Sequence, residues 1–422
     1  MDVLYEVTNL GLAFGTSLTR TGIYRATESF VRAALTHPGL RPRFAALESY
    51  IGELQLVRFD EWAGGLLGAR RVSAWMVDEP ALTTAMELVT RLLEIGPTSA
   101  EGKRLSAELR LLNRTARARP VAAPIDVYHS LRQALVPRDR LQARARVVTI
   151  HDMIPFLFPE LTEDRFIEHH RAIIASIDRE RDWIICNSAC TKADVCGMTA
   201  MSSDRVFVTP FAAAPEIFHP EPDPERIAPV LAKYGVGTRP YVLSLCTLEP
   251  RKNLTRLVRA FFALIEDQRW PDLLLVLVGP TGWKAEGLSA SLAERPRERH
   301  RVVLTGFVPD EDLSALYSGA QVFVFPSLYE GFGLPALEAM QCGVPVITSR
   351  TSSLPELVGQ DAVTVDPTDE DALAQAILDI LRDPDRARAL GRRGVERASR
   401  FTWARTVEET VGAYRTILAA SS

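Results

Sequence analysis

Short apolar runs alternate with amphipathic helical segments along almost the whole chain. Apolar runs of about four to eight residues, bounded by turn residues, are typical of strands buried on both faces of a parallel sheet. Helical segments between such runs are typical of βαβ units. The pattern predicts an α/β fold with two series of strands. The expected strands are residues 3–7, 42–47, 147–150, 183–186 and 206–208 in the first series, and 241–245, 273–278, 302–304, 322–324 and 344–347 in the second.

Residues 210–229 separate the two series and are rich in proline and acidic residues. Proline has no amide hydrogen to donate within a sheet and it stiffens the chain, so we expect an interdomain linker with a hinge near residue 220. The predicted domains are 1–218 and 219–400. A last amphipathic helix is expected in the terminal segment 401–422, where no strand follows to cover its apolar face.

The composition limits the classes of function. The chain has 422 residues and a formal net charge of −4, whereas general nucleic-acid binding needs an excess of lysine and arginine. The five cysteines do not suggest a disulfide framework, and the spacing of Cys186, Cys190 and Cys196 matches no common zinc site. No apolar run is long enough to span a membrane and no signal peptide is evident, so we expect a cytoplasmic protein. We also expect no metal and no other cofactor.

One segment departs from this weakly acidic average. Helical patterns over 81–95 and 101–117 interrupt the first series of strands, and 103–146 holds eleven basic and three acidic residues. A solvated helix face would explain this composition. Alternatively, the segment is a basic patch that contacts an acidic acceptor or the anionic lipid headgroups on the inner face of the plasma membrane.

The segment 327–340 carries the clearest candidate site. It follows an expected strand and contains Gly331 and Gly333, which would allow a tight turn with the backbone close to a ligand. Pro335 is tolerated only in the first turn of a helix, so a helix should begin there. A helix N-terminus presents free amides and partial positive charge, which suit a diphosphate without a metal ion. The residues expected to contact this group are Phe332, Gly333 and Leu334.

Two carboxylates flank this turn. Glu338 lies one turn inside the expected helix, where it can accept hydrogen bonds from the vicinal hydroxyls of a ribose. Glu330 precedes the helix and is placed to meet a sugar ring. The alternative is a pair of solvated surface residues, but their position around a glycine-rich turn at a strand end favours a ligand site.

Two further segments follow strands of the second series. Arg251 and Lys252 lie between a strand and a helix, and cations at a helix N-terminus indicate a bound anion. We expect them to neutralise a departing diphosphate. The alternative is a structural ion pair with Glu249. The backbone groups placed to contact a nucleobase after another strand are those of Gly306, Phe307 and Val308.

The first series offers a second group of candidates. His151 and Asp152 follow the strand 147–150, at the sheet edge where such folds bind ligands, so we expect His151 to act at the site. The loop 15–23 is expected to reach the same diphosphate through Gly22. The histidines expected to be structural or surface residues are His129, His169 and His170.

At these residues the chain resembles glycosyltransferase family 4, a family of retaining GT-B enzymes that includes bacterial mannosyltransferases of polysaccharide and O-antigen assembly. The resemblance covers the second half densely. It rests on the two glutamates separated by seven residues, Glu330 and Glu338, on Glu-Pro-Arg-Lys-Asn at 249–253, and on Gly-Phe-Val at 306–308. The chain departs from the family at Cys246-Thr247, where many members have Gly-Arg or Gly-Thr. It also departs in the loop Thr21-Gly-Ile-Tyr-Arg25, which keeps one glycine of a Gly-Gly-Ile-Gly-Arg sequence.

The resemblance implies a GT-B fold, in which two Rossmann-like parallel-sheet domains face a cleft and the terminal helix crosses back to the N-terminal domain. It implies that the N-terminal domain binds the acceptor and that the C-terminal domain binds the nucleotide sugar. The implied catalytic residues are His151, Glu330 and Lys252. The resemblance further assigns the donor phosphates to Lys252 and Arg251, and the ribose to Glu338.

The expected activity is retaining, metal-independent transfer of a hexose from a nucleotide-diphosphate sugar to a hydroxyl of a saccharide or lipid-linked saccharide. The segments 150–155 and 158–160 are similar to the branch of the family with GDP-mannose enzymes of polysaccharide assembly, so mannose from GDP-mannose is the preferred donor. The alternatives are a UDP, dTDP or GDP-fucose type of donor, a sugar-nucleotide epimerase, and a non-catalytic protein that binds a nucleotide sugar.

Overall fold

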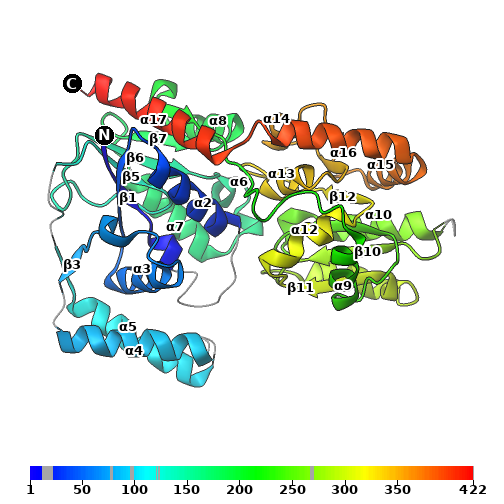
Figure 1. The fold of residues 1–422 in the computed structure, drawn as a ribbon, viewed down its shortest axis with the longest axis horizontal. Coiled ribbons are helices and arrows are strands. Elements are labelled where there is room, and N and C mark those ends of the chain that lie inside the picture. The colour runs from blue at the N-terminus through cyan, green and yellow to red at the C-terminus, as the bar shows by residue number, and fades with distance from the viewer. Residues whose placement is uncertain are drawn as a thin grey trace.

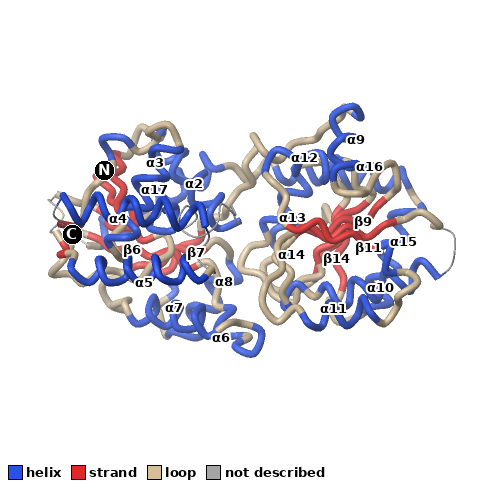
Figure 2. Tube along the Cα trace, turned by 90° about the horizontal axis from the view of Figure 1, so that it is seen from below, coloured by secondary structure: helices blue, strands red, loops and turns tan. Residues whose placement is uncertain are grey.

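The computed structural model describes residues 1–11, 22–76, 79–95, 99–119, 121, 124–266 and 270–421. They form two domains side by side, each built around a six-stranded parallel sheet with helices on both faces (Figures 1 and 2). The strand order is β2-β1-β5-β6-β7-β8 in the first sheet and β11-β10-β9-β12-β13-β14 in the second. The predicted α/β fold with two series of parallel strands is confirmed.

The strands of the first sheet are β1 (Asp2–Glu6), β2 (Arg41–Ala45), β5 (Val127–Ser130), β6 (Ala145–Ile150), β7 (Trp183–Cys186) and β8 (Val206–Val208). Those of the second are β9 (Tyr241–Leu245), β10 (Leu274–Val278), β11 (Val302–Gly306), β12 (Val322–Phe325), β13 (Val346–Ser349) and β14 (Val363–Val365). A short antiparallel pair joins β3 (Trp75–Met76) and β4 (Arg117–Ala118).

Two strands of the two parallel sheets, β5 and β14, were not predicted from the sequence. β5 pairs with β1 and β6 in the middle of the first sheet, but only its first two residues are apolar, so the sequence shows no apolar run there. β14 has three residues and lies at a sheet edge. His129, expected to be a structural or a surface residue, lies in β5 and is 1% exposed. The structural alternative is therefore right and the surface alternative is wrong.

The helices of the first domain are α2 (Gly22–Thr36), α3 (Tyr50–Trp62), α4 (Glu79–Ile95), α5 (Ala100–Thr115), α6 (Ile154–Leu157), α7 (Asp164–Ala175) and α8 (Ala189–Thr199). Those that follow are α9 (Pro224–Lys233), α10 (Leu254–Glu266), α11 (Glu286–Ala293), α12 (Asp310–Ser318), α13 (Leu334–Gln341), α14 (Leu354–Val358), α15 (Glu370–Arg382), α16 (Pro384–Ala398) and α17 (Trp403–Ala420). Serine, threonine or aspartate caps several N-termini, as the free amides of a first turn require.

Helices α4 and α5 form a hairpin that projects from the first domain (Figure 1). Their facing apolar residues form a small core of their own, closed by two residues of α3. The basic segment 103–146 does not form one continuous free surface, because many of its arginines have local partners. Those in ion pairs are Arg104 with Glu108, Arg138 and Arg146 with Asp182, and Arg144 with Asp126.

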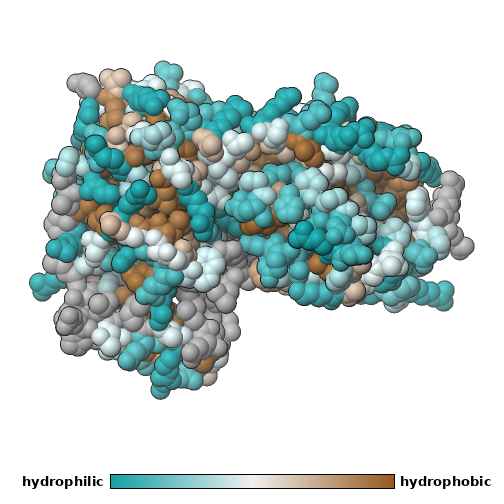
Figure 3. All heavy atoms as spheres, in the orientation of Figure 1, coloured by the Kyte–Doolittle hydropathy of each residue, from teal (hydrophilic) through white to brown (hydrophobic). Residues whose placement is uncertain are grey.

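The face seen in Figure 3 is largely hydrophilic, and the apolar residues on it gather mainly over the first domain. Among the described residues, the exposed large apolar side chains are spread over the molecule and are Trp62, Ile95, Leu111, Met198, Leu304 and Phe307. No helix in the part of the chain that the structure describes is both long and apolar enough to cross a membrane.

Helix α17 returns to the first domain and packs against α2 (Figure 1). The buried residues Val407, Val411, Tyr414 and Ile417 recur at helical spacing and belong to the same apolar core as the first strand. The Tyr414 hydroxyl also hydrogen-bonds with Nδ1 of the buried His129. The terminal helix thus covers its apolar face by crossing back, as predicted.

The chain therefore crosses between the domains twice, at 209–223 and at 399–402. Phe211 of the first crossing contacts Trp403, which begins α17 directly after the second crossing: their ring centroids are 5.6 Å apart. Phe332, in the turn before α13, lies 5.9 Å from Phe211 and 6.1 Å from Phe401. The boundaries expected at residues 218 and 400 lie within these crossings, while the division into domains 1–218 and 219–400 stays a prediction.

Candidate active site

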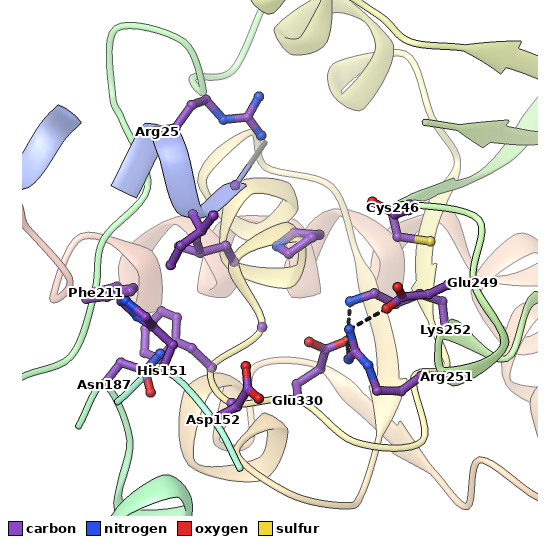
Figure 4. Close-up of a pocket in the computed structure, with 18 of the residues that line it drawn as sticks. Arg25, His151, Asp152, Asn187, Phe211, Cys246, Glu249, Arg251, Lys252 and Glu330 are labelled. Carbon is purple, nitrogen blue, oxygen red and sulfur yellow. Dashed lines mark hydrogen bonds and ion pairs between the residues drawn. The ribbon is translucent and has the colours of Figure 1, made fainter. Parts of the chain in front are cut away.

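A cavity of about 430 Å³ lies between the two domains. It is bordered by the segments that follow β6, β9 and β12, by the first turns of α2 and α13, and by one face of α7. β9 and β12 are neighbours in the second sheet although they are not consecutive in the chain. The loops after two such strands leave the sheet in opposite directions and open a crevice. This topology brings the segments of Arg251 and Glu330 together (Figure 4).

Glu330 joins Arg251 and Lys252 in a buried cluster. Its Oε1 lies 2.6 Å from Lys252 Nζ and 2.8 Å from Arg251 Nη1, and Ser327 donates a hydrogen bond to the same oxygen. Burial alone would raise the pKa of Glu330, but the two cations lower it to about 2. Burial alone would lower the pKa of Arg251, yet Glu330 and Glu249 raise it. Glu330 and Arg251 are therefore ionised at neutral pH.

The anion expected beside these cations is supplied within the protein. Glu330 pairs with both, and Glu249 forms a further ion pair with Arg251. The ion pair to Glu249, which the sequence left open as an alternative, is thus present. The contact of Arg251 and Lys252 with a diphosphate stays a prediction.

Asn253 fixes the turn that carries the two cations. Its backbone is left-handed, with φ of 61°, a conformation that asparagine tolerates better than most residues. Its side-chain amide donates hydrogen bonds to the carbonyl oxygens of Pro326, at 3.0 Å, and Pro367, at 2.6 Å. These bonds tie the turn after β9 to the segments after β12 and β14, and the first of them holds Arg251 and Lys252 against the segment of Glu330.

The turn between β12 and α13 needs glycine at two positions for different reasons. Gly333 has φ of 103° and is the N-cap of α13, so the predicted tight turn and helix start are confirmed. A Cβ at Gly331 would lie 2.1 Å from the carbonyl oxygen of His151. The sequence assigned Gly331 to the close approach of a ligand. The structure shows that two backbones, one from each domain, approach each other there, and that Gly331 also borders the cavity; its approach to a ligand stays a prediction.

His151 lies on the wall formed by the first domain. Its Nε2 is 2.7 Å from the carbonyl oxygen of Leu131, so this nitrogen carries the proton and donates it. Its Nδ1 is buried and has no hydrogen-bond partner among the residues described. Burial lowers the pKa of His151 to about 4. The imidazole is therefore neutral at pH 7 and offers Nδ1 as a hydrogen-bond acceptor.

Glu338 lies at the α13 end of the cavity and is 2% exposed. The Tyr317 hydroxyl donates to its Oε2 at 3.1 Å, and Arg25 Nη2 lies 3.3 Å from its Oε1. Burial raises the pKa of Glu338, while Arg25 acts in the opposite direction. Arg25 also pairs with Asp310 at 3.0 Å. No role was predicted for Arg25, although the loop sequence that ends with it was recognised as unusual.

The other predicted residues lie around the same cavity, with one difference. Gly22 begins α2 and faces Leu334 across the cleft, because a Cβ at Gly22 would meet Leu334 Cδ1 at 3.7 Å. The rest of the loop 15–23, up to residue 21, lies outside the described residues. The lining includes Phe307, Val308, Phe332, Gly333 and Leu334, whereas Gly306 ends β11 beside it and is not among the residues that border it.

Sequence reasoning missed part of the wall from the first domain. His169 and His170 were expected to be structural or surface residues, but both border the cavity on one face of α7. Burial lowers the pKa of His169 to about 4. Arg132, in the coil after β5, borders it too, and burial lowers the pKa of its guanidinium. Had β5 been recognised as a strand, Arg132 would have been found at its C-terminal end.

The sequence of the chain is similar to those of known glycosyltransferases. The family model described as Glycosyl transferases group 1 matches residues 231–397. O-antigen chain mannosyltransferase B of Escherichia coli is 37% identical over 272 residues, which are 64% of this chain and 70% of that protein. The serotype-specific mannosyltransferase WbdA of Escherichia coli is 32% identical over 290 residues, or 68% of this chain, but the match spans only 35% of WbdA.

A third relative is the GDP-mannose-dependent alpha-(1-6)-phosphatidylinositol monomannoside mannosyltransferase of Mycolicibacterium smegmatis. It is 40% identical over 179 residues, 40% of this chain and 46% of that protein.

The fold is that of solved glycosyltransferase structures. A sucrose-phosphate synthase from Thermosynechococcus elongatus aligns with a TM-score of 0.65 and 21% identity, over 99% of each chain. A glycosyltransferase from Rickettsia africae aligns with a TM-score of 0.66 and 16% identity, over 99% of this chain and 98% of that one. With two facing parallel-sheet domains, a returning terminal helix and these relatives, the chain belongs to the group 1 glycosyl transferases and is a glycosyltransferase of the GT-B fold.

Proposed function

We propose that the protein transfers mannose from GDP-mannose to a hydroxyl of a saccharide or lipid-linked saccharide in cell-surface polysaccharide assembly, with retention of the anomeric configuration and without a metal. The names of the three relatives above support mannose as the sugar, and the name of the third supports the guanosine nucleotide. The observation that carries the proposal is the buried cluster of Arg251, Lys252 and Glu330 on the cavity wall.

The cluster suits a leaving diphosphate. In the proposed step the bond between the sugar C1 and the diphosphate oxygen breaks, and its electron pair stays on the diphosphate. The acceptor oxygen bonds to C1 on the same face, and its proton passes to the diphosphate. Arg251, Lys252 and the first turn of α13 stabilise the developing negative charge. Because Glu330 holds both cations, the diphosphate takes over their pairing and frees Glu330 for the sugar hydroxyls.

His151 and Glu338 position the two ends of the donor. The unprotonated Nδ1 of His151 accepts a hydrogen bond from a hydroxyl of the transferred sugar. Glu338 accepts hydrogen bonds from the ribose. Its carboxylate already has two partners, Tyr317 and Arg25, and a carboxylate has about four acceptor positions, so two remain for a vicinal diol.

The metal-free part of the proposal is supported by the two cations on the cavity wall, Arg251 and Lys252. Among the residues described, no group of three or more histidine, cysteine, aspartate or glutamate side chains is arranged to hold a metal ion. The two cations supply the positive charge that a divalent ion would otherwise bring. Transfer is therefore expected to continue in EDTA.

A thermal-shift panel with GDP, UDP, dTDP and ADP tests the donor, because a ligand that binds the folded state raises the unfolding temperature. GDP is expected to give the largest shift; a larger shift with another nucleotide would identify a different donor. Purified protein, GDP-mannose and a mannose-containing acceptor should then release GDP only when the acceptor is present. Conversion of the nucleotide sugar without an acceptor would indicate an epimerase instead.

A further inference from the structure

Arg25 connects the two domains at the side of the cavity away from Glu330 (Figure 4). It belongs to α2, yet its charged partners among the described residues are in the other domain. Its Nη1 lies 3.0 Å from Asp310 Oδ1, and its Nη2 lies 3.3 Å from Glu338 Oε1. Its Cζ lies 5.3 Å from the ring centre of Phe218, a buried residue of the first crossing. One guanidinium thus holds α12, α13 and the crossing segment together.

The partners of Arg25 include two carboxylates that repel each other. Burial raises the pKa of Glu338, and Asp310 acts in the same direction. Arg25 and the hydrogen bond from Tyr317 oppose this effect. Cys342, which follows α13, is a further titratable side chain beside Glu338. Arg25 is the cation of this group, so its loss would leave Glu338 to take up a proton at a higher pH.

A second observation concerns the guanidinium itself. The Nε atom of Arg25 is buried and has no hydrogen-bond partner among the described residues. Arg25 also borders the cavity next to Glu338. An N–H group in this position can donate to a hydroxyl oxygen of a ligand, while the carboxylate beside it accepts from a hydroxyl hydrogen.

We propose that Arg25 is a positioning residue for the donor: from the first domain it holds Glu338 ionised and correctly oriented to accept two ribose hydroxyls. This inference rests on the proposed function, in which Glu338 binds the ribose. The nucleotide site would then need both domains, because Arg25, the cation that pairs with Glu338, belongs to the first domain. A simple structural ion pair would affect stability without changing how nucleotide binding depends on pH.

The test is calorimetric binding of GDP, or of the nucleoside diphosphate that the thermal-shift panel selects, between pH 5.5 and 8. Arg25→Gln is expected to weaken binding about tenfold or more at pH 7. Because Glu338 would then be protonated at a higher pH, binding should also be lost at a higher pH than in the wild-type protein. Adding Asp310→Asn removes the repelling carboxylate and should restore part of the affinity.

Two further variants complete the experiment. Arg32→Gln removes another arginine of α2, one that pairs within the helix with Glu28, and should leave binding unchanged. Arg25→Lys keeps the charge without reaching both carboxylates. It should keep the wild-type pH profile at reduced affinity. If Arg25→Gln does not fold, the binding of Arg25→Lys is measured in its place.

The outcomes separate the two proposals. If the wild-type protein binds none of the four nucleoside diphosphates, the proposed function fails. If the wild-type protein binds one, and Arg25→Gln and Arg25→Lys bind it with the affinity and pH profile of the wild type, the role of Arg25 is overturned. Weaker binding by Arg25→Gln with an unchanged pH profile and no recovery with Asp310→Asn would also overturn it, leaving a structural ion pair.

Discussion

Two buried cations share one carboxylate in the cavity wall. Lys252 and Glu330 each have side chains that are 10% exposed. Taking such charges out of water costs several kcal/mol, and mutual attraction offsets that cost only when the geometry is close and hydrogen bonds satisfy the remaining atoms. Glu330 has this geometry, since Ser327 also donates to it. An anion that enters the cavity must therefore compete with Glu330 for Lys252 and Arg251.

Replacing Lys252 by alanine tests the charge cluster. Lys252→Ala should lower kcat/KM for sugar transfer about tenfold or more, because one of the two charges that stabilise the leaving diphosphate is lost. Lys103→Ala, at an exposed position on α5, is the matched control and should transfer at the wild-type rate. Unchanged turnover in Lys252→Ala would remove this residue from the proposed chemistry.

Among single residues, the sequence predicted those site residues that directly follow an apolar strand. Glu330, Lys252 and His151 were found in this way, and all three border the cavity. Arg25 and Arg132 were not, because each becomes significant only through partners or a strand that the local sequence does not show. A single arginine on an amphipathic helix looks like many solvated ones.

Among the elements, the turn from β12 to α13 packs its backbone directly against the backbone of the first domain. A Cβ at Gly331 would lie 2.1 Å from a backbone oxygen, which cannot rotate away as a side chain would. Gly331→Ala should therefore push the domains apart at His151. A displacement of about 1 Å at a catalytic site can lower a rate by about a hundredfold, so we expect transfer to fall about tenfold or more.

The control for this substitution is Gly412→Ala. Gly412 lies inside α17, and a Cβ there would meet nothing within 4 Å. Alanine should leave transfer unchanged and stabilise the helix by up to about 1 kcal/mol. Rates of transfer and thermal unfolding of both variants are to be compared. Equal transfer by Gly331→Ala and the wild type would mean that the backbone contact is not needed for catalysis.

The elements that could be predicted are those with a clear period. Buried parallel strands with continuous apolar runs, such as β9 and β10, were found nearly to the residue. β5 escaped because His129 and Ser130 are polar and yet buried, satisfied by Tyr414, Thr149 and the backbone of Gln133. Tyr414 and Thr149 lie far from His129 in the chain, so the local sequence does not show that this histidine is buried with partners.

For the whole molecule, three buried histidines make the free energy of unfolding depend on pH. Burial lowers the pKa of His129 to about 3, and those of His151 and His169 to about 4, from an ordinary 6.5. Between pH 6.5 and 4 the unfolded chain binds protons that the folded chain does not, so the free energy of unfolding falls as pH falls. Glu6, whose pKa burial raises to about 7, contributes one change of opposite sign.

Urea unfolding at pH 7 and pH 5 measures this effect. The free energy of unfolding should be lower at pH 5, by about 2 kcal/mol or more. His129→Gln removes one of the three groups and should reduce the difference between the two pH values. A difference between the two pH values that His129→Gln leaves unchanged would contradict the burial of a neutral His129.

Membrane contact through 103–146 stays a prediction, and the structure narrows where it would occur. Lys103, Arg117 and Arg119 are exposed, whereas Arg104, Arg138, Arg144 and Arg146 form ion pairs and Arg132 borders the cavity. Anionic vesicles should bind the protein at low salt and release it near roughly half-molar salt through screening. Neutral vesicles and a Lys103→Glu variant are the controls. Equal binding to neutral and anionic vesicles would exclude an electrostatic contact.

The two crossings mean that the order of residues in the chain does not match the division into folding units. A fragment that ended at residue 218 would contain every strand of the first sheet. It would nevertheless lack Val407, Val411, Tyr414 and Ile417, which fill the apolar core beside Tyr5 and Phe30. Such a fragment would expose that core to water, whereas the separate remainder would carry an apolar helix with nothing to cover it. Each piece would need the other in order to fold, as in fragment complementation, and neither would be an independent protein.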